Sequence, residues 1–437
     1  MRKFYIETYG CQMNVADSEL VNSILREAGY DEAESIDLAD IIIFNTCSVR
    51  QHAEDRVLGR ISNEMSRKQL NPDLKIGVIG CMAQRLGDKL LKRRGEVDFV
   101  AGVDGYRNLP DLIKKTIEKQ TTVAFSTMDS TEMYSEYMPV RKQDLNAFVT
   151  IMRGCNNFCS YCIVPYVRGR ERSRNIDDIV KEVRQAGVEG YKDVTLLGQN
   201  VNSYSFKGYD FPMLLKELNK VDTIRRLRFV TSHPKDLSDE LIEVMATADK
   251  VCEHIHLPMQ SGSSEILFKM NRGYSYEHYR EIVAKLRSNV PNIALSTDAI
   301  AGFPGESEEQ FEMTLKAMED IRFDFAFMFK YSTREGTAAS NYRDTIPEDV
   351  KLFRLDRMIQ QQTKITEEKY RDKIGQEFEV YVEKVSKKDE LELAGRTRDF
   401  KIAVFPGDES LIGSFVRVKI VDAVGWTLKG ELISNSE

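Results

Sequence analysis

The chain has 437 residues, of which 42% are hydrophobic and 30% charged, and its formal net charge is −7. It is too long for one ordinary core, and its acidic balance excludes a whole-molecule attraction to nucleic acid. No apolar run approaches the roughly 20 residues of a membrane span, and the N-terminus lacks the apolar core of a secretory signal. We therefore expect a cytoplasmic protein that makes no membrane contact. Seven cysteines in such a protein indicate metal binding or catalysis, because thiols stay reduced there.

The first third of the chain alternates short apolar runs with helical periodicity. Residues 4–9 form a strand-like run, and from Asp17 onward apolar residues recur at helical spacing. The apolar runs 41–44 and 75–80 are typical of buried parallel strands. Strands that alternate with helices predict a parallel α/β sheet, which we assign to a domain of residues 1–137.

A polar segment over residues 126–142 has no clear period, and we interpret it as a linker. The alternation of strands and helices resumes beyond it, over residues 141–373. Candidate strands lie near residues 147–153, 193–197, 226–231, 253–257, 293–299 and 325–331. A full eight-unit barrel usually needs about 250 residues, so six strand–helix units predict a partial (β/α)6 barrel.

The last segment, residues 374–437, has a different pattern. Apolar and polar residues alternate with a period of two, and turn residues separate the runs, as in a small all-β, OB-like barrel. The segment holds nine Lys and Arg against twelve Asp and Glu, so its charge alone does not indicate RNA binding. Cations that could still gather on one face and contact RNA are Lys387, Lys388, Arg396, Arg398 and Lys401.

Three cysteines follow the first strand of the predicted barrel directly. Cys155, Cys159 and Cys162 are separated by three and then two residues. The loops after the strands carry the chemistry of such barrels, and thiolates are soft ligands for iron–sulfur clusters and zinc. Structural zinc needs four closed ligands, whereas three thiolates leave one iron of a four-iron cluster open to a substrate or cofactor. The spacing therefore favours an iron–sulfur cluster.

Three more cysteines are widely spaced in the sequence but share a position in the predicted sheet. Cys11, Cys47 and Cys81 each come just after a predicted parallel strand. The carboxyl ends of parallel strands lie at one edge of the sheet, so the three thiols are expected to converge on a second cluster. The alternative is that they are small buried side chains, as free cysteines often are. Cys252 has no partner and is interpreted as a core thiol.

These motifs resemble those of the methylthiotransferase family of radical S-adenosylmethionine (SAM) enzymes over nearly the whole chain. The N-terminal cysteine motifs are Thr8–Asn14, Asn45–Arg50 and Gly80–Gln84, and the radical SAM signature is Arg153–Tyr166. The segment from about residue 375 resembles the family's RNA-binding TRAM barrel. The run Tyr-Gly-Cys-Gln-Met-Asn is similar to the first cysteine motif of the branch that acts on tRNA. The branch that acts on a ribosomal protein typically has Gly-Cys-Pro-Lys-Asn, and a third branch, which acts on threonylcarbamoyladenosine, typically has Gly-Cys-Lys-Val-Asn.

The resemblance implies two [4Fe–4S] clusters, with SAM bound at the open iron of the Cys155, Cys159 and Cys162 cluster. One SAM methylates a sulfur held at the other cluster, and a second is cleaved to a 5′-deoxyadenosyl radical. The product carries a methylthio group on carbon 2 of N6-isopentenyladenosine, at position 37 next to the tRNA anticodon. The implied partners are this anticodon stem-loop, an electron donor and a sulfur donor, and the protein is expected to be a monomer.

Residues at the ends of the barrel strands are the candidates for SAM contacts. They are Gly198, Gln199, Asn200, Ser232, Gln260, Ser296 and Asp298, each of which could instead cap a helix or strand. An arginine run beyond the cysteine loop is the candidate for RNA or phosphate contact. It comprises Arg168, Arg170, Arg172 and Arg174, with a solvated loop or salt bridges to Glu171 as the alternative.

Three other functions remain open at this point. The chain could methylthiolate an aspartate of a ribosomal protein, which tests with both substrates would separate. It could be a non-catalytic iron–sulfur protein that binds RNA without cleaving SAM. It could also be a zinc-stabilised RNA-binding protein, which would be colourless and contain zinc rather than iron.

Overall fold

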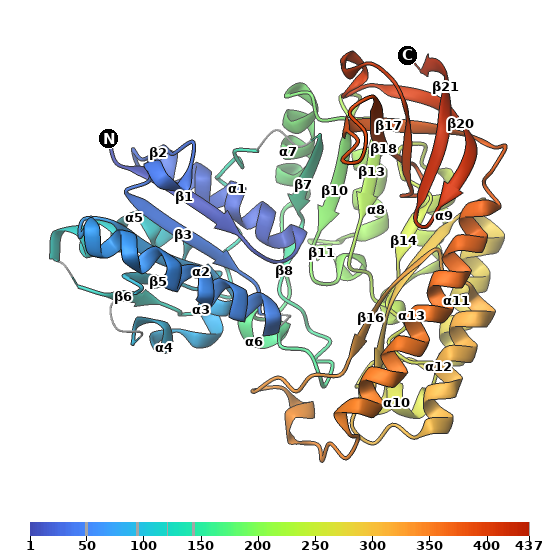
Figure 1. The fold of residues 1–437 in the computed structure, drawn as a ribbon, viewed down its shortest axis with the longest axis horizontal. Helices are drawn as coiled ribbons and strands as arrows, with labels where there is room; N and C mark the ends of the chain where they lie inside the picture. The colour runs from blue at the N-terminus through green and yellow to red at the C-terminus, as the bar shows by residue number, and fades with distance from the viewer. Residues whose placement is uncertain (49–50, 93–95, 120, 142–144, 437) are drawn as a thin grey trace.

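A computed structural model describes residues 1–48, 51–92, 96–119, 121–141 and 145–436 (Figure 1). Val49 and Arg50, at the end of the second cysteine motif, and residue 142, at the end of the predicted linker, lie outside the described residues. Among the described helices, none combines the length and apolar character needed to cross a membrane.

The N-terminal sheet is parallel throughout, as predicted, and its strand order is β2-β1-β3-β4-β5-β6. Its strands are β1 (Lys3–Thr8), β2 (Asp31–Glu32), β3 (Ile41–Thr46), β4 (Lys75–Gly80), β5 (Phe99–Ala101) and β6 (Val123–Phe125). The buried apolar runs became the central strands β3 and β4, because side chains on both of their faces pack against helices. The short strands β5 and β6 were not predicted, since three residues are too few to show a period.

Helices cover both faces of this sheet. One face packs against α1 (Gln12–Glu27) and α5 (Leu109–Lys119). The other packs against α2 (Gln51–Leu70), α3 (Cys81–Leu86) and α4 (Asp88–Leu91). This three-layer arrangement leaves the carboxyl edge of the sheet to carry functional groups.

The second domain is a partial barrel of six parallel strands, as predicted from the spacing of the strand–helix units. Strands β7 (Asn146–Thr150), β10 (Asp193–Leu197) and β13 (Arg226–Phe229) form one sheet. Strands β14 (His254–His256), β15 (Ala294–Ala301) and β16 (Phe325–Lys330) form the other. A parallel bridge between Leu227 and Val251 joins the two sheets.

Six helices of this domain follow its strands. They are α7 (Ile176–Val188), α8 (Phe211–Asn219), α9 (Asp239–Thr247), α11 (Tyr276–Asn289), α12 (Glu308–Ile321) and α13 (Glu348–Arg371). Side chains that cap their first turns explain where five of them begin: Asn175, Asp210, Ser238, Ser275 and Ser307.

The C-terminal segment closes into a barrel, which confirms the period-two interpretation. Its strands, in spatial order, are β17 (Glu377–Val385), β18 (Glu392–Thr397), β19 (Ile402–Pro406), β21 (Thr427–Ser436) and β20 (Phe415–Val424). The barrel lies at the amino ends of the inner strands of the second domain (Figure 1). Their carboxyl ends therefore remain available for the site.

Buried charges hold the C-terminal barrel in this position. Arg226, the fully buried first residue of β13, donates to the backbone oxygen of Glu379 at 3.0 Å and to its carboxylate at 2.9 Å. Arg228 donates to the backbone oxygens of the last residue of β18 and of the residue after it, each at 2.8 Å. Lys401 donates to Asp324 at 2.9 Å. Burial alone would raise the pKa of Asp324, but Lys401 and a second lysine outweigh it and hold the pKa at about 2.

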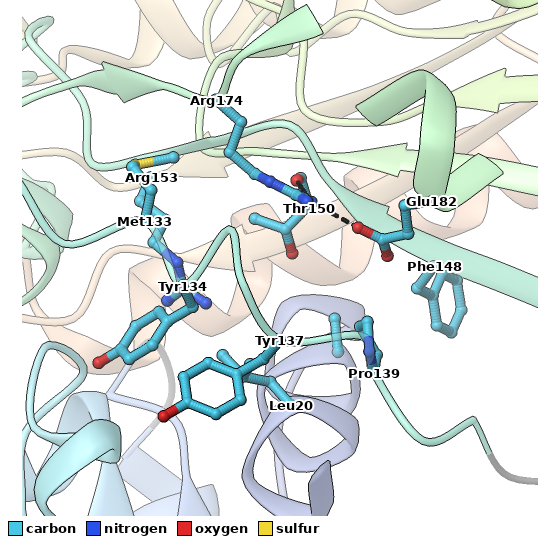
Figure 2. A pocket seen from close by; sticks show the side chains of 11 residues that line it. Leu20, Met133, Tyr134, Tyr137, Pro139, Phe148, Thr150, Arg153, Arg174 and Glu182 are labelled. Carbon is cyan, nitrogen blue, oxygen red and sulfur yellow. Dashed lines mark hydrogen bonds and ion pairs between the residues drawn. The ribbon is translucent and has the colours of Figure 1, made fainter. Parts of the chain in front are cut away.

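The predicted linker is a packed segment rather than a solvated one. Its described part contains no helix or strand, yet Tyr134 is buried and donates to the backbone oxygen of Val103 at 3.0 Å. Figure 2 shows Tyr134, Tyr137 and Pro139 beside α1, lining a small cavity between the first two domains. The segment therefore helps to hold these domains together, a role that composition does not reveal.

Candidate functional site

The cysteine loop of the second domain lies between β8 (Met152–Arg153) and α6 (Val164–Arg168). Cys155 and Cys159 are buried, and the backbone nitrogen of Cys162 donates to the oxygen of Cys159 at 2.9 Å. Gly154 precedes the loop with φ of +78°, and a Cβ there would lie 2.1 Å from the backbone oxygen of Arg170. The loop therefore requires glycine at this point and is held in a compact form.

The environment of Cys155 and Cys162 favours the uncharged thiol until a metal binds. Burial raises the pKa of Cys155, and it raises the pKa of Cys162 to about 12. The buried guanidinium of Arg272 donates to Sγ of Cys159 at 3.3 Å. A bound metal would displace the protons, and Arg272 would then offset part of the thiolate charge. Arg272 lies more than 100 residues beyond the motif, so spacing could not identify it.

The N-terminal cysteines lie after three adjacent strands, as predicted. Cys11 follows β1, Cys47 follows β3, and Cys81 follows β4 and begins α3. A hydrogen bond from Cys47 is the largest cause that lowers the pKa of Cys11 to about 6. Arg168 of α6 donates to Sγ of Cys81 at 3.2 Å. The three thiols therefore gather at one edge of the sheet, facing the second domain.

The cysteine side chains are arranged differently from those of a site that binds a single metal ion. Within the described ranges, no three His, Cys, Asp or Glu side chains have the arrangement of a single-ion site. The thiolates of a four-iron cluster bind different irons and need not converge on one point.

A buried carboxylate links the two groups of cysteines. Asp17 of α1 is 0% exposed and accepts from Arg153 at 2.9 Å and from Arg168 at 2.8 Å. Arg153 lies two residues before Cys155, and Arg168 contacts Cys81. Burial alone would raise the pKa of Asp17, but the two arginines outweigh it and lower the pKa. The three charges fix how the two cysteine groups lie relative to each other.

The arginine run differs from its prediction as an RNA-contacting surface. Arg168 and Arg174 are only 3% and 6% exposed, and Arg174 donates to Glu182 at 2.6 Å (Figure 2). Arg172 is half-buried and pairs with Asp104. We therefore correct the prediction for these three arginines, because the internal carboxylates of Asp17, Glu182 and Asp104 occupy them. Arg170 is exposed and stacks over a ring of the cysteine loop, so it remains a candidate.

Several predicted SAM residues carry buried polar atoms that lack a partner within the described structure. These atoms are Oδ1 of Asn200, Oγ of Ser232 and Oε1 of Gln260, together with Nε2 of His233. Unpaired buried polar groups are costly, so several of them at the carboxyl ends of neighbouring strands indicate a ligand site. Gln199 accepts from the backbone nitrogen of Gly154 and supports the cysteine loop.

The remaining SAM candidates differ in their surroundings. A Cβ on Gly198 would lie 2.5 Å from the side chain of Met152, so this turn has room only for glycine. Oγ of Ser296 lies 3.0 Å from ring nitrogens of both His254 and His256. Asp298 Oδ1 lies 3.4 Å from Nε2 of His256. These polar side chains form a cluster inside the barrel that the sequence did not predict as a unit.

The basic candidates of the C-terminal barrel separate into two groups. Lys387 and Lys388 are exposed and available to RNA. Arg396 pairs with Glu383 at 2.9 Å. Arg398 pairs with Glu253 of the second domain at 2.7 Å, so it docks the barrel rather than presenting its charge to RNA. Lys401 is buried and donates to Asp324, so it is not available to RNA either. The prediction is therefore corrected for Arg398 and Lys401.

Comparison with known proteins agrees with this organisation. Residues 149–318 match the radical SAM superfamily, residues 371–433 match the TRAM domain, and residues 3–102 match the uncharacterized protein family UPF0004. The chain is 49% identical to a tRNA-2-methylthio-N(6)-dimethylallyladenosine synthase of Thermoanaerobacter sp. (strain X514), over 98% of this chain and 92% of that one. It is 48% identical to the enzyme of that name from Clostridium botulinum (strain Langeland), over 99% and 97%.

A solved structure has a similar fold at low sequence identity. It is the radical SAM methyltransferase TsrM from Kitasatospora setae, with tryptophan substrate and a SAM analog bound. The TM-score is 0.56 at 14% identity, and the match covers 75% of this chain and 73% of that one. The likeness therefore extends beyond the partial barrel, and it concerns the fold alone.

Proposed function

The chain belongs to the family of the tRNA-2-methylthio-N(6)-dimethylallyladenosine synthases, and on that premise we propose that it methylthiolates carbon 2 of N6-isopentenyladenosine at position 37 of tRNA. The observation that carries this proposal is 49% identity over 98% of the chain. Two groups of three cysteines, joined by Asp17 at the seam between two domains, support it from the structure.

The residues of the second domain fit a [4Fe–4S] cluster and SAM, which membership of the radical SAM superfamily implies. Cys155, Cys159 and Cys162 would hold the cluster and leave one iron open. The unpaired atoms of Asn200 and Ser232 are suitable partners for the polar groups of SAM. When bound, cluster and SAM supply the radical chemistry that removes hydrogen from a carbon where acid–base catalysis would struggle.

A second [4Fe–4S] cluster on Cys11, Cys47 and Cys81 is part of the proposal. The adjacent strand ends and the Cys11–Cys47 hydrogen bond support it. Arg168 would stabilise the thiolate of Cys81 through its N–H···S hydrogen bond. Asp17 keeps this guanidinium in place and orients the two cysteine groups toward each other. The protein thereby positions the sulfur-bearing site beside the SAM site.

Recognition of the target adenosine requires that it leave the stack of the anticodon loop. Arg170 over Phe158 offers a cation and a ring beside the cysteine loop, and Lys387 and Lys388 offer exposed charge on the C-terminal barrel. We also propose the domain boundaries 1–137, 141–373 and 374–437. The proposal also includes external electron and sulfur donors, a monomeric state and a cytoplasmic location.

Nucleoside mass spectrometry tests the proposed reaction. The protein, reconstituted anaerobically, is incubated with SAM, a reductant, sulfide and tRNA that carries N6-isopentenyladenosine. The same tRNA without the isopentenyl group and a ribosomal-protein peptide with the target aspartate are the matched alternatives. We expect the methylthio nucleoside only in the first reaction. SAM cleavage without this product, or a modified peptide, would contradict the proposed substrate.

A further inference from the structure

A row of aromatic rings connects the partial barrel with the C-terminal barrel. Phe325 and Phe327 of β16 have ring centroids 4.6 Å apart, and Phe325 lies 5.5 Å from Trp426. Trp426 occupies the turn between β20 and β21, together with Gly425. We call Phe325, Phe327 and Trp426 the aromatic row. It joins two domains through residues about 100 positions apart in the sequence.

Two rings of the aromatic row are exposed to solvent. Phe327 is 44% exposed and Trp426 is 45% exposed. Large rings normally contribute their area to a core, and contiguous exposed apolar surface marks an interaction site. Strand β16 is the last strand of the open barrel and pairs with β15 alone among the described strands. The row therefore forms an accessible surface along the open edge of the barrel.

The aromatic row leads from the C-terminal barrel toward the candidate site. Phe327 is paired in register with Asp298, and the ring of His256 contacts it edge-on at 5.9 Å. Beyond the carboxyl end of β16, the backbone nitrogen of Ala339 donates to the oxygen of Ser160 in the cysteine loop at 2.7 Å. A strand of RNA that reaches from the C-terminal barrel to the cysteine loop can therefore follow this edge.

We propose that the aromatic row is a stacking site for unpaired anticodon-loop bases that flank the target adenosine, an inference that rests on the proposed function. Every base has a flat face that stacks on aromatic side chains, and an anticodon loop presents several unpaired bases. Electrostatic attraction between the hairpin and RNA does not supply this contact. The exposed Lys419 and Lys429 of the same hairpin lie opposite Glu431 and Asp422, so the local charge is balanced.

The chain offers a direct optical probe of this site, because Trp426 is its only tryptophan. The reconstituted protein is titrated, at fixed salt, with a synthetic anticodon stem-loop RNA that carries N6-isopentenyladenosine. We expect saturable quenching of the tryptophan fluorescence as a base stacks on Trp426. Anisotropy of the labelled RNA then gives the Kd of each variant without reliance on fluorescence from the protein.

Variants separate stacking from simple apolar contact. Phe327→Ala and Trp426→Ala each remove one ring, and we expect Kd to rise by roughly tenfold. Phe327→Leu keeps apolar volume without a flat ring, so it should weaken binding nearly as much, whereas Trp426→Phe should bind as the wild type does. Phe353→Ala removes a ring that is 60% exposed near the start of α13, and it is the control that should leave Kd unchanged.

The results of these experiments test the stacking site separately from the proposed reaction. Unquenched fluorescence at saturating RNA, or a Phe327→Leu protein that binds as tightly as the wild type, would overturn the stacking site. A loss of affinity seen only with isopentenylated RNA would also overturn it, because the prenyl group and not a base would then occupy the row. The nucleoside assay decides the reaction separately, since methylthiolation by a protein with an unquenched tryptophan would leave the proposed function intact.

Discussion

Replacement of Asp17 by Asn removes the negative charge between two buried arginines and keeps the size of the side chain. Asp17 is fully buried and accepts from Arg153 and Arg168 at 2.9 and 2.8 Å. Removing one partner of a buried ion pair typically costs about 3–5 kcal/mol, because the remaining charge stays buried without compensation. We therefore expect Asp17→Asn to lower the free energy of unfolding by about this amount.

Urea unfolding at pH 7, followed by circular dichroism, measures this loss. The chain has several domains, so the loss should lower the midpoint of the transition that separates the N-terminal sheet from the partial barrel. Glu27→Gln, at the exposed end of the same helix, is the control and should change stability by less than about 0.5 kcal/mol. An Asp17→Asn protein that matches this control would refute the role assigned to the buried carboxylate.

The pH dependence gives an independent check of the same charge. The arginines lower the pKa of Asp17 below its ordinary value of 3.8. A lowered pKa stabilises the folded protein above the unfolded pKa, and the contribution is lost as pH falls through the folded pKa. The difference in stability between wild type and Asp17→Asn should therefore be full at pH 7 and shrink below about pH 4.

Three further perturbations test the docking of the C-terminal barrel and the cysteine loop. The pKa of Asp324 in the folded protein is about 2, so this carboxylate should contribute about 2.5 kcal/mol to the free energy of unfolding above pH 4. This contribution should disappear toward pH 2. An acid titration of the Asp324→Asn protein should lack this loss of stability. Arg226→Met leaves Glu379 without its buried donor, and limited proteolysis should then cut between α13 and β17 faster than in the wild type. Gly154→Ala should reduce the iron content after reconstitution, because a Cβ at this position meets backbone atoms. Gly190 also has a positive φ of +104° but has open space around it, so Gly190→Ala should leave the iron content unchanged. Equal iron content in both variants would refute the steric argument.

The strands and the cysteines were predictable from local patterns. The apolar runs 41–44 and 75–80 became buried central strands, and the six barrel strands occur where the alternation placed them. The shared position of Cys11, Cys47 and Cys81 after adjacent strands followed from the parallel topology alone. These features depend on residues that are close in the sequence, or on the rule that the carboxyl ends of parallel strands lie at one edge of the sheet.

The fate of the charged residues was not predictable, because it depends on partners far away in the chain. Arg168 meets Asp17, 151 positions earlier, and Arg398 meets Glu253, 145 positions earlier. A run of arginines has the same sequence whether it faces RNA or buried carboxylates. The packed state of Tyr134 in the linker likewise depends on contacts with the N-terminal domain.

The most direct test of the account is to measure SAM cleavage and methylthiolation side by side in two cysteine variants. Reconstituted wild type, Cys155→Ala and Cys47→Ala are incubated with SAM, reductant, sulfide and isopentenylated tRNA, and chromatography quantifies 5′-deoxyadenosine and the methylthio nucleoside. We predict that Cys155→Ala forms neither product, and that Cys47→Ala still forms 5′-deoxyadenosine but no methylthio nucleoside. Equal loss of SAM cleavage in both variants would contradict separate roles for the two groups of cysteines.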